Sequence, residues 1–222
     1  MSTDEGLRRV FDRIAPAWYN FRHRTIFPRE LERLAVEWGG GRLLNVGCGH
    51  GADFPPFAGG FELNGLDFSR EMLKLALKYA EKYGFQASFI QGDAVALPYE
   101  SSAFDHAIAV ATYHHLKAEQ RLAAMVELKR VLKPGGNAFV TVWNRCQPRF
   151  WFTGADVDVP WRSGRETLCR YYHLFTYGEL IGLARRAGFD TVRAFPEEEY
   201  RFPFRRFSRN ICLVLKKPRT YV

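Results

Sequence analysis

The run Leu43-Leu44-Asn45-Val46-Gly47-Cys48-Gly49-His50-Gly51 indicates the fold class of this 222-residue chain. Its first half is apolar and has the composition of a buried strand. Its second half alternates glycine with other residues. Because glycine has no Cβ, it permits positive φ and lets backbone N–H groups approach a ligand closely. A buried strand that turns into such a loop is typical of α/β domains that bind nucleotides.

Strand-like and helix-like patterns alternate along the rest of the chain. Strands are predicted at residues 42–48, 61–68, 87–91, 104–111, 138–143, 191–195 and 210–215, and helices between Ser69 and Gly84, at 118–132 and at 177–187. Such alternation builds a mostly parallel sheet with helices on both faces. No helix separates the last two strands, so we expect a hairpin that places one antiparallel strand in a seven-stranded sheet.

Two segments fall outside this pattern, and we expect both to belong to one domain spanning residues 1–222. An N-terminal arm, residues 1–40, is predicted to be helical over 7–38; it either covers the mouth of the ligand site or packs on the sheet. Packing is favoured for its first aromatic residues, and substrate contact stays open for Arg22-His23-Arg24. Residues 145–175 contain prolines and glycines without a clear period, which predicts an irregular insertion or lid.

Composition limits the class of protein. No run of about 18 apolar residues occurs, and the N-terminus lacks a signal-peptide pattern, so we expect a cytoplasmic protein without a membrane span. None of the four cysteines forms a Cys-x-x-Cys pair. A structural zinc site within the chain is therefore not expected, and free thiols are.

The net charge of +8 is unevenly distributed along the chain. Residues 1–40 contribute +1 and residues 41–144 are neutral, whereas residues 145–222 hold fifteen basic and eight acidic side chains, which gives +7. A neutral core beside a basic flank suggests a small cofactor in one part and a polyanion at the other. The alternative is a high pI without a specific partner.

No single motif of the candidate cofactor site identifies the cofactor, but several motifs together do. Residues 47–52 also satisfy the dinucleotide pattern G-x-G-x-x-A. Asp67, at the end of the second strand, is placed to accept hydrogen bonds from both ribose hydroxyls; the alternative, a helix cap, is already filled by Ser69. The segment Gln91-Gly92-Asp93-Ala94 separates a dinucleotide site from a methyltransferase site. Asp93 can accept from an adenine amino group while the Ala94 N–H meets a ring nitrogen, and a dehydrogenase has no such need at that position.

The span from Leu43 to Asn144 resembles the class I S-adenosylmethionine-dependent methyltransferases, with Lys133-Pro134-Gly135-Gly136 as its last motif. The resemblance implies a Rossmann-like fold and S-adenosylmethionine as cofactor. One departure is Asn45, where the family usually has Asp; Asn keeps the shape but loses the charge, which bears on cofactor affinity. The cofactor-binding residues implied are Asn45, Gly47, Cys48, Gly49, Gly51, Asp67, Phe68, Asp93, Ala94, Ala109 and Val110.

Short flanking motifs resemble one subfamily, the tRNA wobble-uridine methyltransferases, which esterify 5-carboxymethyluridine. These motifs are residues 11–15, 113–115, 159–161, 170–175 and 178–180. The resemblance implies tRNA modification, RNA binding at the anticodon loop, and a small zinc-binding activator protein that covers an apolar face of the sheet. The third strand would be the sheet edge, and residues 87–90 are apolar enough to need covering.

The chemistry of such a substrate selects the candidate catalytic residues. A carboxylate nucleophile needs cations to position it and no base to activate it, so the candidates beyond the fifth strand are Arg145, Arg170, Tyr172 and His173. His114 or His115 is a candidate base, or else walls the pocket. The arginines and phenylalanines of residues 201–209 extend the basic, aromatic flank, or form a solvated hairpin.

Three functions remain open from the sequence. The first is a tRNA carboxyl methyltransferase. The second is a small-molecule methyltransferase that acts on a quinone or lipid precursor, because the same core is widely used there. The third is a non-enzymatic binder that uses the cofactor fold as a scaffold. Charge asymmetry and the 170–173 segment favour the first, and fold alone does not decide function.

Overall fold

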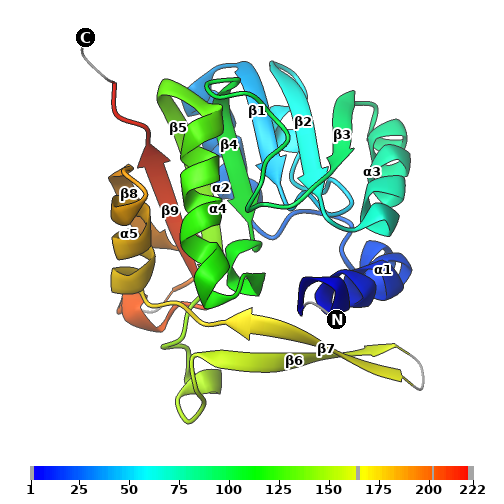
Figure 1. Ribbon diagram of the computed structural model, residues 1–222, viewed down its shortest axis with the longest axis vertical. Helices are drawn as coiled ribbons and strands as arrows, with labels where there is room; N and C mark the ends of the chain where they lie inside the picture. The colour runs from blue at the N-terminus through cyan, green and yellow to red at the C-terminus, as the bar shows by residue number, and fades with distance from the viewer. Residues whose placement is uncertain (1–2, 164–165, 202, 220–222) are drawn as a thin grey trace.

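The computed structural model describes residues 3–163, 166–201 and 203–219 (Figure 1). Its helices are α1 (Thr3–Phe21), α2 (Pro28–Trp38), α3 (Arg70–Tyr83), α4 (Ala118–Val131) and α5 (Tyr177–Arg186). Its strands are β1 (Gly41–Val46), β2 (Phe61–Asp67), β3 (Ala87–Gln91), β4 (Phe104–Val110), β5 (Leu132–Trp143), β6 (Asp156–Ser163), β7 (Glu166–His173), β8 (Asp190–Pro196) and β9 (Asn210–Lys216). No helix in the described ranges is long and apolar enough to cross a membrane.

The main sheet has seven strands in the order β3-β2-β1-β4-β5-β9-β8. Strands β1 to β5 pair in parallel, and β9 is antiparallel to both of its neighbours, β5 and β8. The predicted mostly parallel sheet with one antiparallel strand is confirmed, as is β3 as its edge. The α/β class follows from the strand–helix alternation of the sequence.

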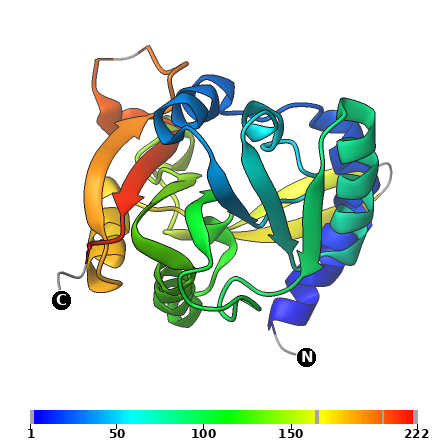
Figure 2. The ribbon, with the colours of Figure 1, turned by 90° about the horizontal axis from the view of Figure 1, so that it is seen from above.

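Both faces of the sheet are buried, as predicted for an alternating α/β chain. On one face α4 and α5 pack on residues such as Leu44 and Ala107; on the other, α2 and α3 pack on Leu43 and Ile108 (Figure 2). Neighbouring residues of one strand point to opposite faces. Consecutive apolar residues in β1 and β4 therefore pack into two separate hydrophobic cores, one on each face of the sheet.

Local signals fix the helix ends. The Ser69 hydroxyl accepts from the Met72 N–H at 3.1 Å and caps α3, and Gly84 ends that helix at φ 68°. Residues 133–136 end α4 as expected, but they form the start of β5, which begins at Leu132. The difference has a local cause: the register of β4 and β5 shifts between Phe104 and His106, so the turn is absorbed into the strand pair.

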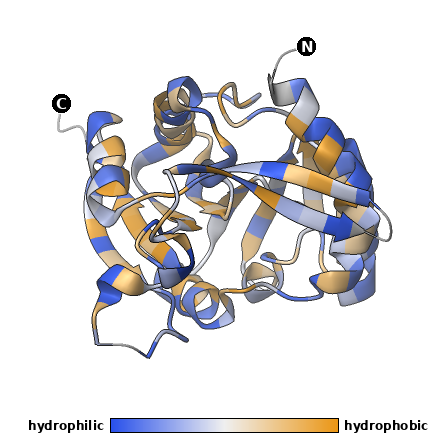
Figure 3. Cartoon of the chain, turned by 90° about the horizontal axis from the view of Figure 1, so that it is seen from below, coloured by the Kyte–Doolittle hydropathy of each residue, from blue (hydrophilic) through white to orange (hydrophobic). Residues whose placement is uncertain are grey.

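The insertion after β5 is present, but the prediction that it is irregular was wrong for residues 156–163 and 166–173. These residues form an antiparallel hairpin of β6 and β7 with Val159 opposite Arg170 and Trp161 opposite Leu168. Polar and apolar residues alternate at the start of β6, from Asp156 to Val159, and the hairpin crosses the view of Figure 3. Pro160 obscured this period, yet a two-stranded hairpin accepts it because an edge strand leaves N–H groups unpaired.

The N-terminal arm is helical, as predicted, and forms α1 and α2. Helix α2 packs on the sheet, whereas α1 packs on α3 and the hairpin. Trp18 and Phe21 lie 5.3 and 5.7 Å from the ring of Trp161, and Arg13 pairs with Glu166. Figure 1 shows α1 and the hairpin below the ends of the parallel strands. Together they roof the edge of the sheet where ligands of this fold bind.

Gly47 gives the fold its first test. Its φ is +71°, and a Cβ there would lie 2.3 Å from the Thr112 hydroxyl, which is held by its bond to the Val46 carbonyl. We expect Gly47→Ala to lower the free energy of unfolding by about 1–3 kcal/mol. Gly182, in α5 with nothing within 4 Å, is the matched control. Gly182→Ala should raise the free energy by about 0.5–1 kcal/mol. Equal thermal stability of the two variants would contradict the steric role of Gly47.

Candidate active site

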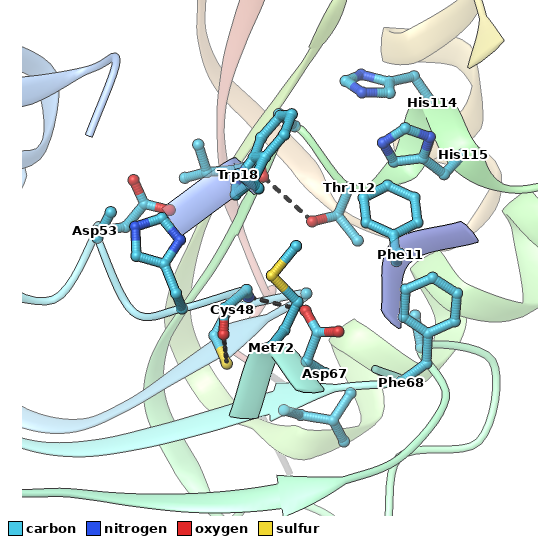
Figure 4. Close-up of a pocket in the computed structure, with 18 of the residues that line it drawn as sticks. Phe11, Trp18, Cys48, Asp53, Asp67, Phe68, Met72, Thr112, His114 and His115 are labelled. Carbon is cyan, nitrogen blue, oxygen red and sulfur yellow. Dashed lines mark hydrogen bonds between the residues drawn. The ribbon is translucent and has the colours of Figure 1, made fainter. Parts of the chain in front are cut away.

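A cavity of about 190 Å³ lies at the carboxyl ends of β1, β2 and β4, under the roof of α1 and the hairpin (Figure 4). Its floor is the glycine loop after β1. Phe11 and Phe68, with ring centroids 5.4 Å apart, form one wall, and Asp53 lies on the other side. The predicted residues that line it are Gly47, Cys48, Gly49, Asp67, Phe68, Asp93, Ala94, Val110, His114 and Tyr172.

The glycine loop is held against β2 by its backbone. The N–H groups of Gly47 and Cys48 both donate to the Leu66 carbonyl, at 2.7 and 2.9 Å. Gly49 has φ +53°, and a Cβ there would meet nothing within 4 Å. The loop therefore presents a bare backbone surface to the cavity, where a ligand can come close.

Asp67 is a buried carboxylate that the loop itself orients. Its Oδ2 accepts from Gly49 N–H at 2.8 Å and its Oδ1 from Ser69 N–H at 2.9 Å. Burial raises the pKa of this carboxyl to about 6, against those two hydrogen bonds, which lower it. A carboxylate has about four acceptor positions, so about two remain for hydroxyl groups of a ligand. Asp93 also lines the cavity, and its Oδ1 accepts from Val95 N–H at 3.1 Å.

Asp53 is a site residue that the sequence motifs did not predict. Asn45 is fully buried in β1 and does not line the cavity, whereas Asp53 does. Burial raises the pKa of Asp53 to about 6, while Thr25, Arg22 and Asn45 act in the opposite direction. Asp53 therefore brings a carboxylate to the cavity wall, which Asn45 does not. No motif marks Asp53, because it follows the glycines at a position where the loop conformation alone decides where the side chain points.

The arm contributes Arg22 to the cavity. Its Nε is buried without a hydrogen-bond partner, and burial lowers the pKa of its guanidinium. Burial lowers the pKa of His50 to about 4, so this neutral ring donates from Nε2 to the Arg22 carbonyl at 2.6 Å. Tyr79 donates to the His23 carbonyl at 2.8 Å. Of the open Arg-His-Arg run, Arg22 and Arg24 line the cavity.

His114 and His115 are held as opposite tautomers. Burial lowers the pKa of His115 to about 4 and that of His114 well below its usual range. Trp143 N–H donates to Nδ1 of His114 at 3.2 Å, so the proton of that ring is on Nε2. His115 donates from Nδ1 to the Tyr171 carbonyl at 3.0 Å, which leaves its Nε2 as an acceptor. His114 therefore offers a donor to the cavity, not a base.

Arg170 backs the wall that Tyr172 forms. The two residues lie on one face of β7, and the guanidinium donates to the Tyr172 hydroxyl at 3.0 Å. Its carbon lies 5.3–5.5 Å from the ring centroids of Trp18, Trp161 and Tyr172. Arg170 is 5% exposed, its Nε has no hydrogen-bond partner, and no carboxylate of the described ranges pairs with it. A buried cation of this kind lacks its anion.

Three predicted catalytic residues do not line the cavity. Arg170 lies behind Tyr172, and His173 and Arg145 lie further away. Both ring nitrogens of His173 face carboxylates, Asp156 at 2.8 Å and Glu179 at 2.6 Å, so His173 ties the hairpin to α5 and offers nothing to a ligand. Arg145 is exposed on the loop after β5. The predicted cofactor residues Gly51 and Ala109 are likewise buried behind the cavity wall. A sequence motif predicts which part of the fold such residues occupy, but not where their side chains point.

Comparisons with known proteins match this chain to methyltransferases. A family described as "Methyltransferase domain" matches residues 43–136. A putative methyltransferase of Encephalitozoon cuniculi is 32% identical over 72% of this chain and 75% of that protein. The 2-phytyl-1,4-naphtoquinone methyltransferase of Synechocystis sp. is 33% identical over 74% of this chain and 77% of its own. A tRNA (carboxymethyluridine(34)-5-O)-methyltransferase of Arabidopsis thaliana is 34% identical over 62% of this chain, which spans only 32% of that relative.

Solved structures agree on the fold. The 1,6-didemethyltoxoflavin-N1-methyltransferase of Burkholderia thailandensis, with bound S-adenosylhomocysteine, superposes with a TM-score of 0.70 at 19% identity, over 97% of this chain and 88% of that one. A putative methyltransferase of Haloferax volcanii, in complex with the Trm112 methyltransferase activator, superposes with a TM-score of 0.68 at 18% identity, over 97% and 99%. At such identities the likeness concerns the fold alone.

The raised pKa of Asp53 predicts a gain in stability when its charge is removed. Because its folded-state pKa, about 6, lies above the ordinary 3.8, its contribution to the free energy of unfolding is present below about pH 4 and is lost as pH rises through about 6. We expect Asp53→Asn to be more stable than wild type at pH 8, by on the order of 2 kcal/mol, with the difference closing toward pH 4. Thermal unfolding over this pH range measures it. Asp158→Asn, at an exposed position of β6, is the control; a difference for Asp53→Asn that does not change with pH would contradict the assignment.

Proposed function

Because the chain belongs to the S-adenosylmethionine-dependent methyltransferase family, we propose that it methylates the carboxylate of 5-carboxymethyluridine at the wobble position of a tRNA. Membership makes the protein an enzyme with S-adenosylmethionine as cofactor, and this overturns the third hypothesis, a non-enzymatic binder. The acceptor is the part that we infer. It rests on the side chains around the cavity and on distant relatives that act on this nucleoside.

The groups around the cavity fit the cofactor. Asp67 has acceptor positions left for ribose hydroxyls, and Asp93 with Ala94 lies where an adenine edge would be read. Asp53 offers a carboxylate for the ammonium group and Arg22 an unpartnered Nε for the carboxylate of the amino acid tail. Bound there, S-adenosylmethionine supplies an electrophilic methyl group on a positively charged sulfur.

One observation carries the choice of acceptor: the buried guanidinium of Arg170 has no anionic partner in the described part of the chain. Aromatic faces compensate such a cation only in part. The electrostatic field of Arg170 reaches the cavity wall. Burial raises the pKa of the Tyr172 hydroxyl there, and the positive charges of Arg170, Arg22 and Arg149 act to lower it. A carboxylate on the substrate would give these cations their counter-charge, and charge-assisted hydrogen bonds would orient it.

The chain's residues match what ester formation requires. A carboxylate is already ionised and attacks without losing a proton, so the reaction requires neither His114 nor His115 as a base. The attack neutralises a negative and a positive charge, and a dry, apolar surrounding favours such a step over one in water. Phe11, Phe68 and Met72 supply apolar walls that exclude water. Arg170 and Tyr172 align the nucleophile, and alignment is the main catalytic contribution in such a displacement.

We propose that a small activator protein covers the β3 edge. Among the strands that the structure describes, β3 pairs with β2 alone. Ser88, Ile90 and Gln91 on β3 are exposed, with Ile90 at 40%. Leu77 and Tyr83 on the adjacent α3 are exposed as well, at 59% and 42%. An open strand edge beside apolar side chains is a template for pairing with another chain. The Haloferax neighbour in complex with an activator supports this partner.

A second candidate function is methylation of a small apolar acceptor such as a quinone. The Synechocystis relative, which this chain covers over more of its length than the Arabidopsis one, favours it. The aromatic lining suits a quinone ring. The uncompensated charge of Arg170 does not, because a neutral acceptor would leave that cation without an anion.

Transfer of labelled methyl groups distinguishes the two candidates. With S-adenosylmethionine as donor, and with and without the activator, we expect label to enter total tRNA and to be released by mild alkali, because an ester hydrolyses there. Total lipid extract from the same cells is the parallel acceptor. Label found only in the lipid extract would favour the second candidate and contradict the first.

Arg170 and Asp67 should separate the acceptor site from the cofactor site. Arg170→Met keeps the volume and removes the charge, so we expect kcat/KM for tRNA to fall about 100-fold while the Kd for S-adenosylhomocysteine changes less than about twofold. Asp67→Ala should instead abolish cofactor binding. Arg162→Met, at an exposed position of the same hairpin, is the control and should leave both unchanged. Loss of cofactor affinity in Arg170→Met would refute this division of roles.

A further inference from the structure

The geometry points to a surface for the nucleotides that flank the acceptor base. We propose that a basic–aromatic strip, made of Arg149, Trp151, Phe152, Arg206 and Arg209, binds single-stranded RNA next to the cavity. The proposal rests on the RNA acceptor proposed above and assigns it a second binding surface. It concerns two segments that are far apart in sequence, the loop after β5 and the segment before β9.

The strip begins at the cavity wall. Trp143 lines the cavity, and the guanidinium of Arg149 lies 5.8 Å from its ring centroid and 5.2 Å from that of Phe150. Trp143 and Phe150 are themselves 5.9 Å apart. One step further out, Trp151 lies 5.9 Å from Phe207, over which Arg206 is placed at 5.8 Å. If one base of an RNA strand occupied the cavity, the nucleotides next to it would run over these side chains.

Buried amides hold the two segments together. Asn144 donates from Nδ2 to the Arg206 carbonyl at 2.9 Å, and its backbone N–H donates to the Arg209 carbonyl at 3.0 Å. Gln147 donates from Nε2 to the Arg209 carbonyl at 3.2 Å. Both amide side chains are buried. The strip is therefore one fixed surface, and substitution of its exposed side chains leaves this framework in place.

The charge of the strip is not neutralised by its neighbours. Arg149, Arg206 and Arg209 are exposed and form no ion pair within the described ranges. Two of the three glutamates at 197–199 are otherwise engaged. Glu197 is buried and accepts from the backbone N–H groups of Arg209 and Asn210, at 3.0 and 2.7 Å, and Glu198 pairs with Arg33. Three arginines without a paired acid give a surface that attracts a polyanion.

The aromatic members are more exposed than packing explains. Phe152 is 99% exposed and Trp151 57%. Trp151 is nonetheless held in place, because its Nε1 donates to the Cys146 carbonyl at 2.8 Å. Exposed aromatic rings near arginines are how proteins bind unstacked bases without reading their sequence, and Trp151 is one that is fixed. A small apolar acceptor would have no use for them, which is why the strip favours RNA.

Binding of a fluorescently labelled anticodon stem-loop RNA to the full chain tests the strip. For Phe152→Ala we expect Kd to rise about fivefold or more, because one base can no longer stack. For the double variant Arg206→Glu/Arg209→Glu we expect at least about a tenfold rise, and a salt dependence of log Kd that is shallower by roughly 0.7 for each phosphate that the arginines no longer neutralise. Methylation of the free 5-carboxymethyluridine nucleoside should be unchanged in both, since the cavity is intact.

The control is Arg185→Glu/Arg186→Glu, which makes the same change of charge on exposed residues at the far end of α5. If wild type methylates tRNA but the strip variants bind RNA as well as the control does, the strip is overturned and the proposed function stands. If wild type neither binds nor methylates RNA, both fail together. Strip variants that lose the activator protein and keep RNA affinity would make the surface a protein-docking site, contrary to the proposal.

Discussion

The buried guanidinium of Arg170 is the point on which three parts of the structure converge. Trp18 of the N-terminal arm, Trp161 of the hairpin and Tyr172 of the cavity wall all present ring faces to it, at 5.3–5.5 Å. The roof of the cavity is therefore built around a cation without a carboxylate partner in the described ranges. A protein maintains such a costly arrangement when a ligand supplies the missing anion. The same residue links fold and chemistry, because removing its charge should leave the roof but not the orientation of the acceptor.

The cofactor side of the cavity shows how a changed motif is compensated. Asn45 lacks the charge that its family usually has at that position, and Asp53 brings a carboxylate to the cavity from the loop that follows. Asn45 lies in β1 and is buried, while Asp53 in the loop after β1 lines the cavity with a carboxylate.

The sequence predicted what local rules decide. Ser69 and Gly84 bound α3 because capping and positive φ depend only on nearby residues. The antiparallel β9 followed from the order of elements, and the edge position of β3 from the strand order that the family resemblance implies. What it missed depends on long-range direction. His173 lies in the predicted segment but turns to Asp156 and Glu179, and Asp53 reaches the cavity without any motif. The hairpin was missed because Pro160 hid a period of two.

Affinity for the acceptor moiety alone tests the central claim most directly. With S-adenosylhomocysteine bound, calorimetry can compare 5-carboxymethyluridine with 5-carbamoylmethyluridine, which has the same shape and no charge. We predict that the acid binds at least about tenfold more tightly than the amide, and that this preference disappears when Arg170 is replaced by Met. Equal affinity of the two nucleosides for the wild-type protein would contradict the assignment of Arg170 to a carboxylate acceptor.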